Sequence, residues 1–171
     1  MTAIVAKNIA DVRKRGAEVQ AISAIAFYVL AAGVVGEIVV APVWDLVKSW
    51  GAAPWDAWRR DFGVRWVDVL PAMILMGGLW CAQRLFGRVG AGDVFTAANA
   101  RDLERIGASL GWCALFVFFE PMLKALITRS PDDIDFEFWA IVLSLLGGAV
   151  VLVGRIWGLA VEVKAENDQI V

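Results

Sequence analysis

The amino-acid sequence predicts an all-α protein, a four-helix bundle that is integral to a membrane. Of its 171 residues, 60% are hydrophobic, and the mean hydropathy is +0.66. The apolar residues form four runs, each long enough to cross a bilayer core, which needs about 20 residues. Backbone groups in lipid must find hydrogen-bond partners within the chain, and the runs lack the alternation of a membrane β-barrel. Each run is therefore expected to be a helix.

The four predicted spans belong to a single membrane domain, residues 1–171. They cover about 21–43, 66–86, 105–127 and 138–161. The last three are interrupted, so their boundaries are approximate; the interrupting residues are Pro71, Glu120 with Pro121, and Arg155.

The distribution of Lys and Arg predicts the orientation of the spans. Ten of the sixteen lie in or beside the N-terminal segment, the 87–104 connection and the C-terminal tail. The other six lie in or beside the first and third connections. Positively charged flanks stay in the cytoplasm, so we expect both termini and the 87–104 connection to be cytoplasmic in a bacterial inner membrane.

The first extracytoplasmic connection contains an amphipathic aromatic segment. Pro54 suits the first turn of a helix. Aromatic side chains then recur every three or four residues, at Trp55, Trp58, Phe62 and Trp66. This pattern predicts either an interfacial helix, with its rings at the headgroup level, or an aromatic lid over an outward-facing cavity.

Charged residues also occur within or beside the predicted spans. With about 1.5 Å of rise per residue, Glu37 and Glu120 lie roughly 24 Å and 22 Å from the cytoplasmic starts of their helices. Lys124 follows Glu120 by four residues, the spacing of a helical ion pair. Asp68 lies at nearly the same depth, at the outer end of the second span.

Three interpretations of this polar group remain open. It can be an ion-pair network that fixes helix register, a pocket for a small cation or peptide, or a site of proton or ion translocation. The candidate ligand-binding residues are Glu37, Asp68, Glu120 and Lys124, together with Trp55 and Trp58 of the aromatic segment.

Small residues four apart predict close helix contacts, either within one chain or in a homo-oligomer. Two patterns are Gly-x-x-x-Gly, at Gly107 with Gly111 and at Gly154 with Gly158. Two looser patterns are Ala32 with Gly36 and Ser144 with Gly148.

Two predicted cytoplasmic segments have distinctive sequences. In the first, Thr96 is a candidate N-cap, with Asn99 three residues later. The following helix is expected to turn Leu103 and Ile106 toward the bundle and its charged residues toward the cytoplasm; these are Arg101, Asp102, Glu104 and Arg105. The second segment is the charged tail that contains Glu166-Asn167-Asp168.

The pattern Phe95-Thr96-x-x-Asn99-x-x-x-Leu103-x-x-Ile106-Gly107, with Glu166-Asn167-Asp168, resembles a family of small bacterial four-helix membrane proteins of unknown function. This chain ends Gln169-Ile170-Val171, whereas that family commonly ends in a Leu-Thr-Val-like tripeptide. The resemblance implies a cytoplasmic partner, a helix-turn-helix transcription regulator. The candidate partner-binding residues are Phe95, Thr96, Asn99, Arg101, Arg105, Glu166, Asn167 and Asp168.

The composition argues against several other functions. The chain has no His and a net charge of −2, and Cys81 and Cys113 lack metal-ligand spacing. We therefore expect no catalytic set, no metal or cofactor, and no direct contact with nucleic acid. The favoured function is a non-enzymatic regulator or sensor whose partners are the lipid bilayer and a cytoplasmic protein. The alternatives are a small transporter or ion-coupled carrier, and an envelope immunity or structural protein.

Overall fold

The computed structural model describes residues 3–48, 55–129 and 136–168, and these residues are almost entirely helical. No strand occurs in this part of the chain. The elements are α1 (Ala3–Val35), the π-helix η1 (Gly36–Val40), α2 (Ala41–Lys48), α3 (Trp55–Ala91), α4 (Ala97–Thr128) and α5 (Trp139–Asp168).

Within the described ranges, four helical segments are long and apolar enough to cross a membrane. They are Ala10–Lys48, which joins α1, η1 and α2, and then Asp61–Ala91, Ala97–Thr128 and Trp139–Asp168. The prediction of an all-α, multi-pass membrane protein is therefore confirmed. Each observed helix extends beyond the predicted span, because polar residues continue the helix past its apolar part.

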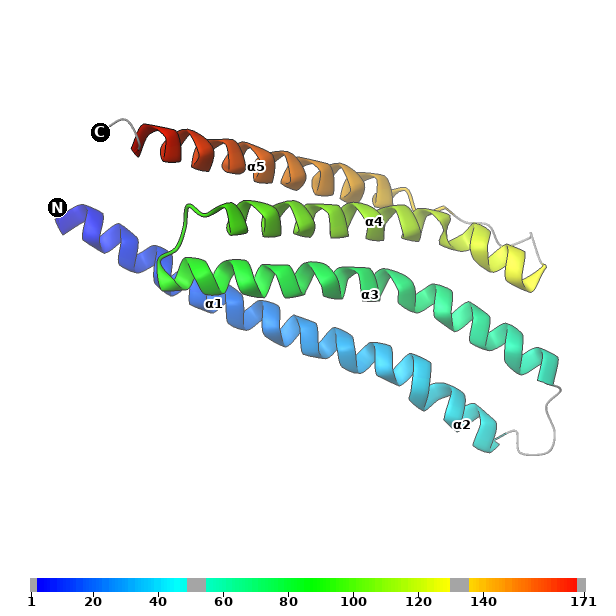
Figure 1. Cartoon of the computed structure of the whole chain (residues 1–171). Helices are drawn as coiled ribbons and strands as arrows, with labels where there is room; N and C mark the ends of the chain where they lie inside the picture. Colours follow the sequence, from blue (N-terminus) through cyan, green and yellow to red (C-terminus); the bar gives the residue numbers. More distant parts are fainter. Residues whose placement is uncertain (1–2, 49–54, 130–135, 169–171) are drawn as a thin grey trace.

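The four long helices lie side by side in the order α1, α3, α4, α5 (Figure 1). Among the described residues, α3 packs against α1 and α4, whereas the main neighbour of α5 is α4. Both termini and the α3–α4 connection lie at one end, which we call the terminal end (Figure 1). The other end, which carries α2 and the start of α3, we call the distal end.

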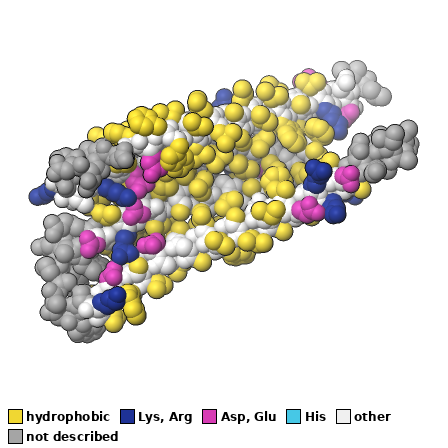
Figure 2. All heavy atoms as spheres, turned by 180° about the vertical axis from the view of Figure 1, so that it is seen from behind, with side chains coloured by type: hydrophobic (Ala, Val, Ile, Leu, Met, Phe, Trp, Pro, Cys, Tyr) yellow, Lys and Arg dark blue, Asp and Glu magenta, His cyan; other side chains and the backbone are white. Residues whose placement is uncertain are grey.

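Apolar side chains cover the middle of the molecule and charged side chains lie toward its two ends (Figure 2). Large hydrophobic residues of the membrane helices are well exposed, for example Tyr28 on α1 and Leu145 on α5. A soluble protein does not leave so extensive an apolar surface open to water, but a bilayer solvates it. The distribution of charge thus agrees with four membrane crossings.

Glycines let α4 and α5 approach each other closely. An ideal Cβ on Gly107 would lie 2.6 Å from the backbone nitrogen of Val151, and one on Gly147 would lie 2.7 Å from the carbonyl oxygen of Gly107. Gly154 similarly faces Glu104 of α4. Both Gly-x-x-x-Gly patterns therefore contribute to a contact within the chain.

The glycines of the two looser small-residue patterns do not lie in such contacts. A Cβ added to Gly36 or to Gly148 would meet no atom within 4 Å among the described residues. In this part of α5, Gly147, the neighbour of the predicted Gly148, is buried against α4.

A proline explains the π-helical turn in the first crossing. Pro42 has no N–H and cannot bond the carbonyl four residues earlier, so an α-helical hydrogen bond is missing there. The backbone N–H of Ala41 instead donates to the carbonyl of Gly36, five residues back. The helix widens by one residue and continues into α2.

The aromatic segment of the first connection is helical, as expected, and it is continuous with the second membrane helix. α3 begins at Trp55 and runs without interruption to Ala91. Phe62 and Trp66 make an edge-to-face contact with ring centroids 6.1 Å apart. The side chains of Trp55 and Trp58 lie outside the described residues, so their role as a lid stays a prediction.

Candidate functional site

The first charged group lies at the distal end, between α3 and α4. The ammonium of Lys124 lies 2.6 Å from a carboxylate oxygen of Glu120, one turn earlier on α4, and it also pairs with Asp68 of α3. The expected helical ion pair is therefore present, and the structure adds Asp68 to it across the helix interface. One cation serves two carboxylates.

Glu37 lies on the other side of α3 and has a cation of its own. Its carboxylate is 3.2 Å from a guanidinium nitrogen of Arg65, which also binds Asp45 of α2 at 2.6 Å. The Glu37 side chain is 59% exposed. Glu37 and Glu120 therefore belong to two ion-pair groups, each anchored on α3, and sequence reasoning missed Arg65 as the cation of the first.

These groups lie near one boundary of the apolar layer. Along α4, Glu120 is about 27 Å from Asp102 at the terminal end, which compares with a hydrocarbon core about 30 Å thick. Charged side chains at such a boundary can reach water. The geometry favours the interpretation of Glu120, Lys124 and Asp68 as an interhelical network; their role in ligand binding stays a prediction.

The second charged group lies at the terminal end and centres on Asp102. The prediction that Asp102 faces the cytoplasm is wrong, because the residue is only 3% exposed. Its carboxylate forms ion pairs with two arginines of α3: a guanidinium nitrogen of Arg84 lies 2.7 Å from one oxygen, and Arg88 binds the other. A guanidinium nitrogen of Arg105, on α4, lies 3.7 Å away. Of the four charged residues expected to meet water here, Asp102 packs against α3, whereas Arg101 and Arg105 are exposed as predicted.

The α3–α4 connection is held by backbone and side-chain hydrogen bonds. Gly92, with φ of 103°, ends α3 in a conformation that a side chain would strain, and the N–H of Asp93 bonds the carbonyl of Arg88. This pair of features is a Schellman motif. The predicted N-cap is confirmed, because the Thr96 hydroxyl accepts a hydrogen bond from the backbone N–H of Asn99 at 3.2 Å.

Asn99 acts inside this connection. Its side chain is 1% exposed and its amide donates to the carbonyls of Asp93 and Val94, at 2.6 and 2.8 Å. Among the candidate partner-binding residues, Asn99 is therefore buried, and its side chain stabilises the backbone of the connection. A partner that binds here would contact the residues around it.

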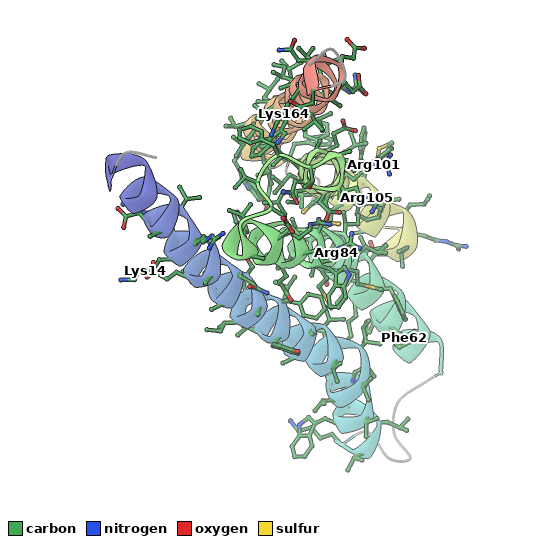
Figure 3. All side chains as sticks on the ribbon, turned by 60° about the vertical axis from the view of Figure 1, so that its left-hand side comes forward. Lys14, Phe62, Arg84, Arg101, Arg105 and Lys164 are labelled. Carbon is green, nitrogen blue, oxygen red and sulfur yellow. The ribbon has the colours of Figure 1, made fainter. Side chains whose placement is uncertain are left out.

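Other candidate partner-binding residues are exposed around the connection. Phe95 is 61% exposed, and its ring centroid lies 5.7 Å from that of Trp157, which brings the connection against α5. Arg101 and Arg105 lie near Arg84 where α3 and α4 adjoin (Figure 3). The tail residues are exposed on the last turns of α5; they are Glu166, Asn167 and Asp168.

The described residues contain no group of three His, Cys, Asp or Glu side chains that could hold a metal ion. Cys81 and Cys113 are both free and buried, one on α3 and one on α4. Each contributes a small hydrophobic side chain to helix packing.

The family model described as "protein of unknown function (DUF2975)" matches residues 18–171. The match covers most of the first membrane helix, all of the other three, and both distinctive segments. The chain belongs to this family. The family assignment agrees with the expected resemblance to membrane proteins of unknown function, and it assigns no activity or site residue. No match was found among curated proteins or among solved structures.

Proposed function

We propose that the protein is a non-enzymatic regulator that binds a cytoplasmic protein at its terminal end. The observation that carries the proposal is the position of Phe95, an exposed aromatic ring on a connection held by hydrogen bonds. Burial of a phenylalanine side chain by a partner contributes about 2 kcal/mol to binding. Because Asn99 and Gly92 already fix the backbone, little ordering entropy opposes that binding.

The surroundings of Phe95 suit a protein partner. The ring lies tilted beside that of Trp157 of α5, and the neighbouring exposed residues carry both signs of charge. Aromatic residues with a polar, charged rim are typical of protein interfaces. We call this the docking surface; it consists of Phe95, Arg101, Arg105 and the exposed end of α5 from Glu162 to Asp168.

The partner class follows from the resemblance noted in the sequence. A helix-turn-helix regulator that bound this surface would be held at the inner membrane, away from its DNA. The two central helices connect the distal ion-pair groups to the docking surface, so a ligand or envelope state that disturbed Asp68 or Lys124 would act on α3 and α4 directly. Because the partner is cytoplasmic, both termini would lie in the cytoplasm, as the distribution of Lys and Arg predicts.

Site-specific photo-crosslinking in living cells tests the partner. A photoreactive phenylalanine analogue at position 95 should crosslink a helix-turn-helix protein, whereas the same analogue at position 138 should not. Phe138 is a matched control, because it is also an exposed phenylalanine and lies at the distal end. Equal crosslinking from both positions, or lipid alone at position 95, would refute the docking surface.

Cysteine labelling tests the orientation independently. In a chain with Cys81 and Cys113 replaced by Ala, a membrane-impermeant maleimide added to cells with a permeabilised outer membrane should label Asp61→Cys and not Glu166→Cys. The opposite labelling would place the docking surface outside the cytoplasm and would reject the proposed partner class.

A further inference from the structure

An open groove lies between α1 and α3 near the terminal end. Its volume is about 410 Å³. Most of its lining surface is apolar, and four polar side chains reach it. The lining residues are Trp80, Gly87 and Ala91 together with Gln20, Gln83, Arg84 and Arg88. Arg84 and Arg88 therefore lie between Asp102 on one side and this groove on the other.

The charges around Asp102 do not balance. Three guanidinium groups lie within 4 Å of this one buried carboxylate, which leaves two positive charges in excess. Arg84 and Arg88 each use one terminal nitrogen for Asp102. The remaining donors of the two guanidinium groups can face the groove, because Arg84 and Arg88 both line it. Excess positive charge near a low-dielectric region favours a bound anion.

We propose that this groove binds a phosphate group, supplied by the headgroup of an anionic phospholipid or by free phosphate. Arginine suits this ligand because its planar guanidinium donates two parallel hydrogen bonds to phosphate oxygens. Gln20 and Gln83 supply amide groups on the two walls of the groove. Basic pockets between membrane helices are a known way to hold anionic lipid headgroups.

The position of the groove suits a lipid in particular. Along α3, Arg84 is about 24 Å from Asp68 in the distal network, so it lies near the opposite boundary of the apolar layer. Trp80, one turn closer to the membrane centre, is 53% exposed and packs beside Phe27 of α1. A headgroup at Arg84 and Arg88 would leave its acyl chains beside these aromatic rings.

Gly87 lies against the side chain of Gln20 on the opposite wall. A Cβ there would lie 3.0 Å from the amide nitrogen of Gln20, so a larger residue would displace that side chain. The groove is separate from Phe95 and does not depend on a protein partner. A negative result in the lipid-binding experiment would therefore leave the docking surface standing, and a negative crosslinking result at position 95 would leave the groove standing.

Native mass spectrometry of the full chain, released from vesicles with equal amounts of phosphatidylglycerol and phosphatidylcholine, tests the site. The wild type should retain phosphatidylglycerol preferentially. Arg84→Gln should reduce this preference about tenfold, because a charge-assisted bidentate contact is lost. Ala91→Trp should reduce it similarly by filling the groove, with the arginines unchanged. Arg101→Gln is the control, since it removes an exposed charge that does not line the groove.

The outcomes separate the possible anions. Displacement of phosphatidylglycerol by inorganic phosphate would identify the phosphate group alone as the ligand; retention of the lipid would show that its glycerol or acyl chains also contribute. The proposal is overturned if the wild type shows no preference or if Arg101→Gln loses as much as Arg84→Gln. It is also overturned if Ala91→Trp binds normally, because the anion would then lie outside the groove.

Discussion

The closest helix contact gives the sharpest test of the fold. In Gly107→Ala, the new methyl group would lie 2.6 Å from the backbone nitrogen of Val151 and 2.7 Å from the carbonyl oxygen of Gly147. Both atoms belong to the backbone of α5, so rotation of a side chain cannot relieve the overlap. Ordinary contact begins at 3.4 Å, which requires α4 and α5 to separate by about 0.8 Å. A gap of that size removes roughly a quarter to a half of the dispersion energy of the contacts that it opens.

Overpacking of this kind costs about 1–3 kcal/mol, and the helix propensity of alanine offsets about 0.5–1 kcal/mol of it. Gly148→Ala is the matched control, because a Cβ at position 148 meets no atom within 4 Å among the described residues. Unfolding in detergent by added dodecyl sulfate, followed by tryptophan fluorescence, should show Gly107→Ala to be less stable than Gly148→Ala by about 2 kcal/mol. Equal stabilities would refute the assigned α4–α5 contact.

Two further predictions concern the charged groups and use the same unfolding assay. Asp102→Asn leaves Arg84 and Arg88 without a counter-ion and should lower stability by about 3 kcal/mol, whereas the exposed Asp93→Asn should change it by less than about 0.5 kcal/mol; similar values for the two would contradict the burial of Asp102. Lys124→Met should destabilise more than Glu120→Gln, since the first leaves two carboxylates unpaired and the second leaves the lysine with Asp68. The reverse order would reject the shared-cation arrangement.

The sequence predicts those features that depend on neighbours along the chain. Span positions follow from local hydropathy, the Thr96 cap from the residues of one turn, and the Glu120–Lys124 pair from helical spacing. Each is settled within a few residues, and tertiary packing has little power to change it.

Features that depend on which helices adjoin could not be predicted in this way. Asp102 has three charged neighbours in its own helix segment and looks like a surface residue until α3 places Arg84 and Arg88 against it. The spacing of those two arginines, one turn apart at the end of a span, was a signal that a buried acid faces them. Likewise, Gly147 and Gly148 are adjacent and have nearly the same sequence neighbours. Only the register of α5 against α4 decides which of the two is buried.

The register of α5 against α4 also changes the interpretation of the charged residues that interrupt the predicted spans. Gly154 packs against Glu104, so its neighbour Arg155 lies near the level of Asp102, at the terminal boundary of the apolar layer. Glu120 lies about 27 Å away, near the distal boundary. Both residues interrupt hydrophobic runs in the sequence, yet each lies near an end of the layer in the folded chain. Ser109, which is deeper, donates its hydroxyl to the carbonyl of Ile74 at 2.6 Å. The ion-pair groups of the described residues thus lie near the two faces of the apolar layer, and the hydroxyl of Ser109 in between is satisfied by a backbone carbonyl.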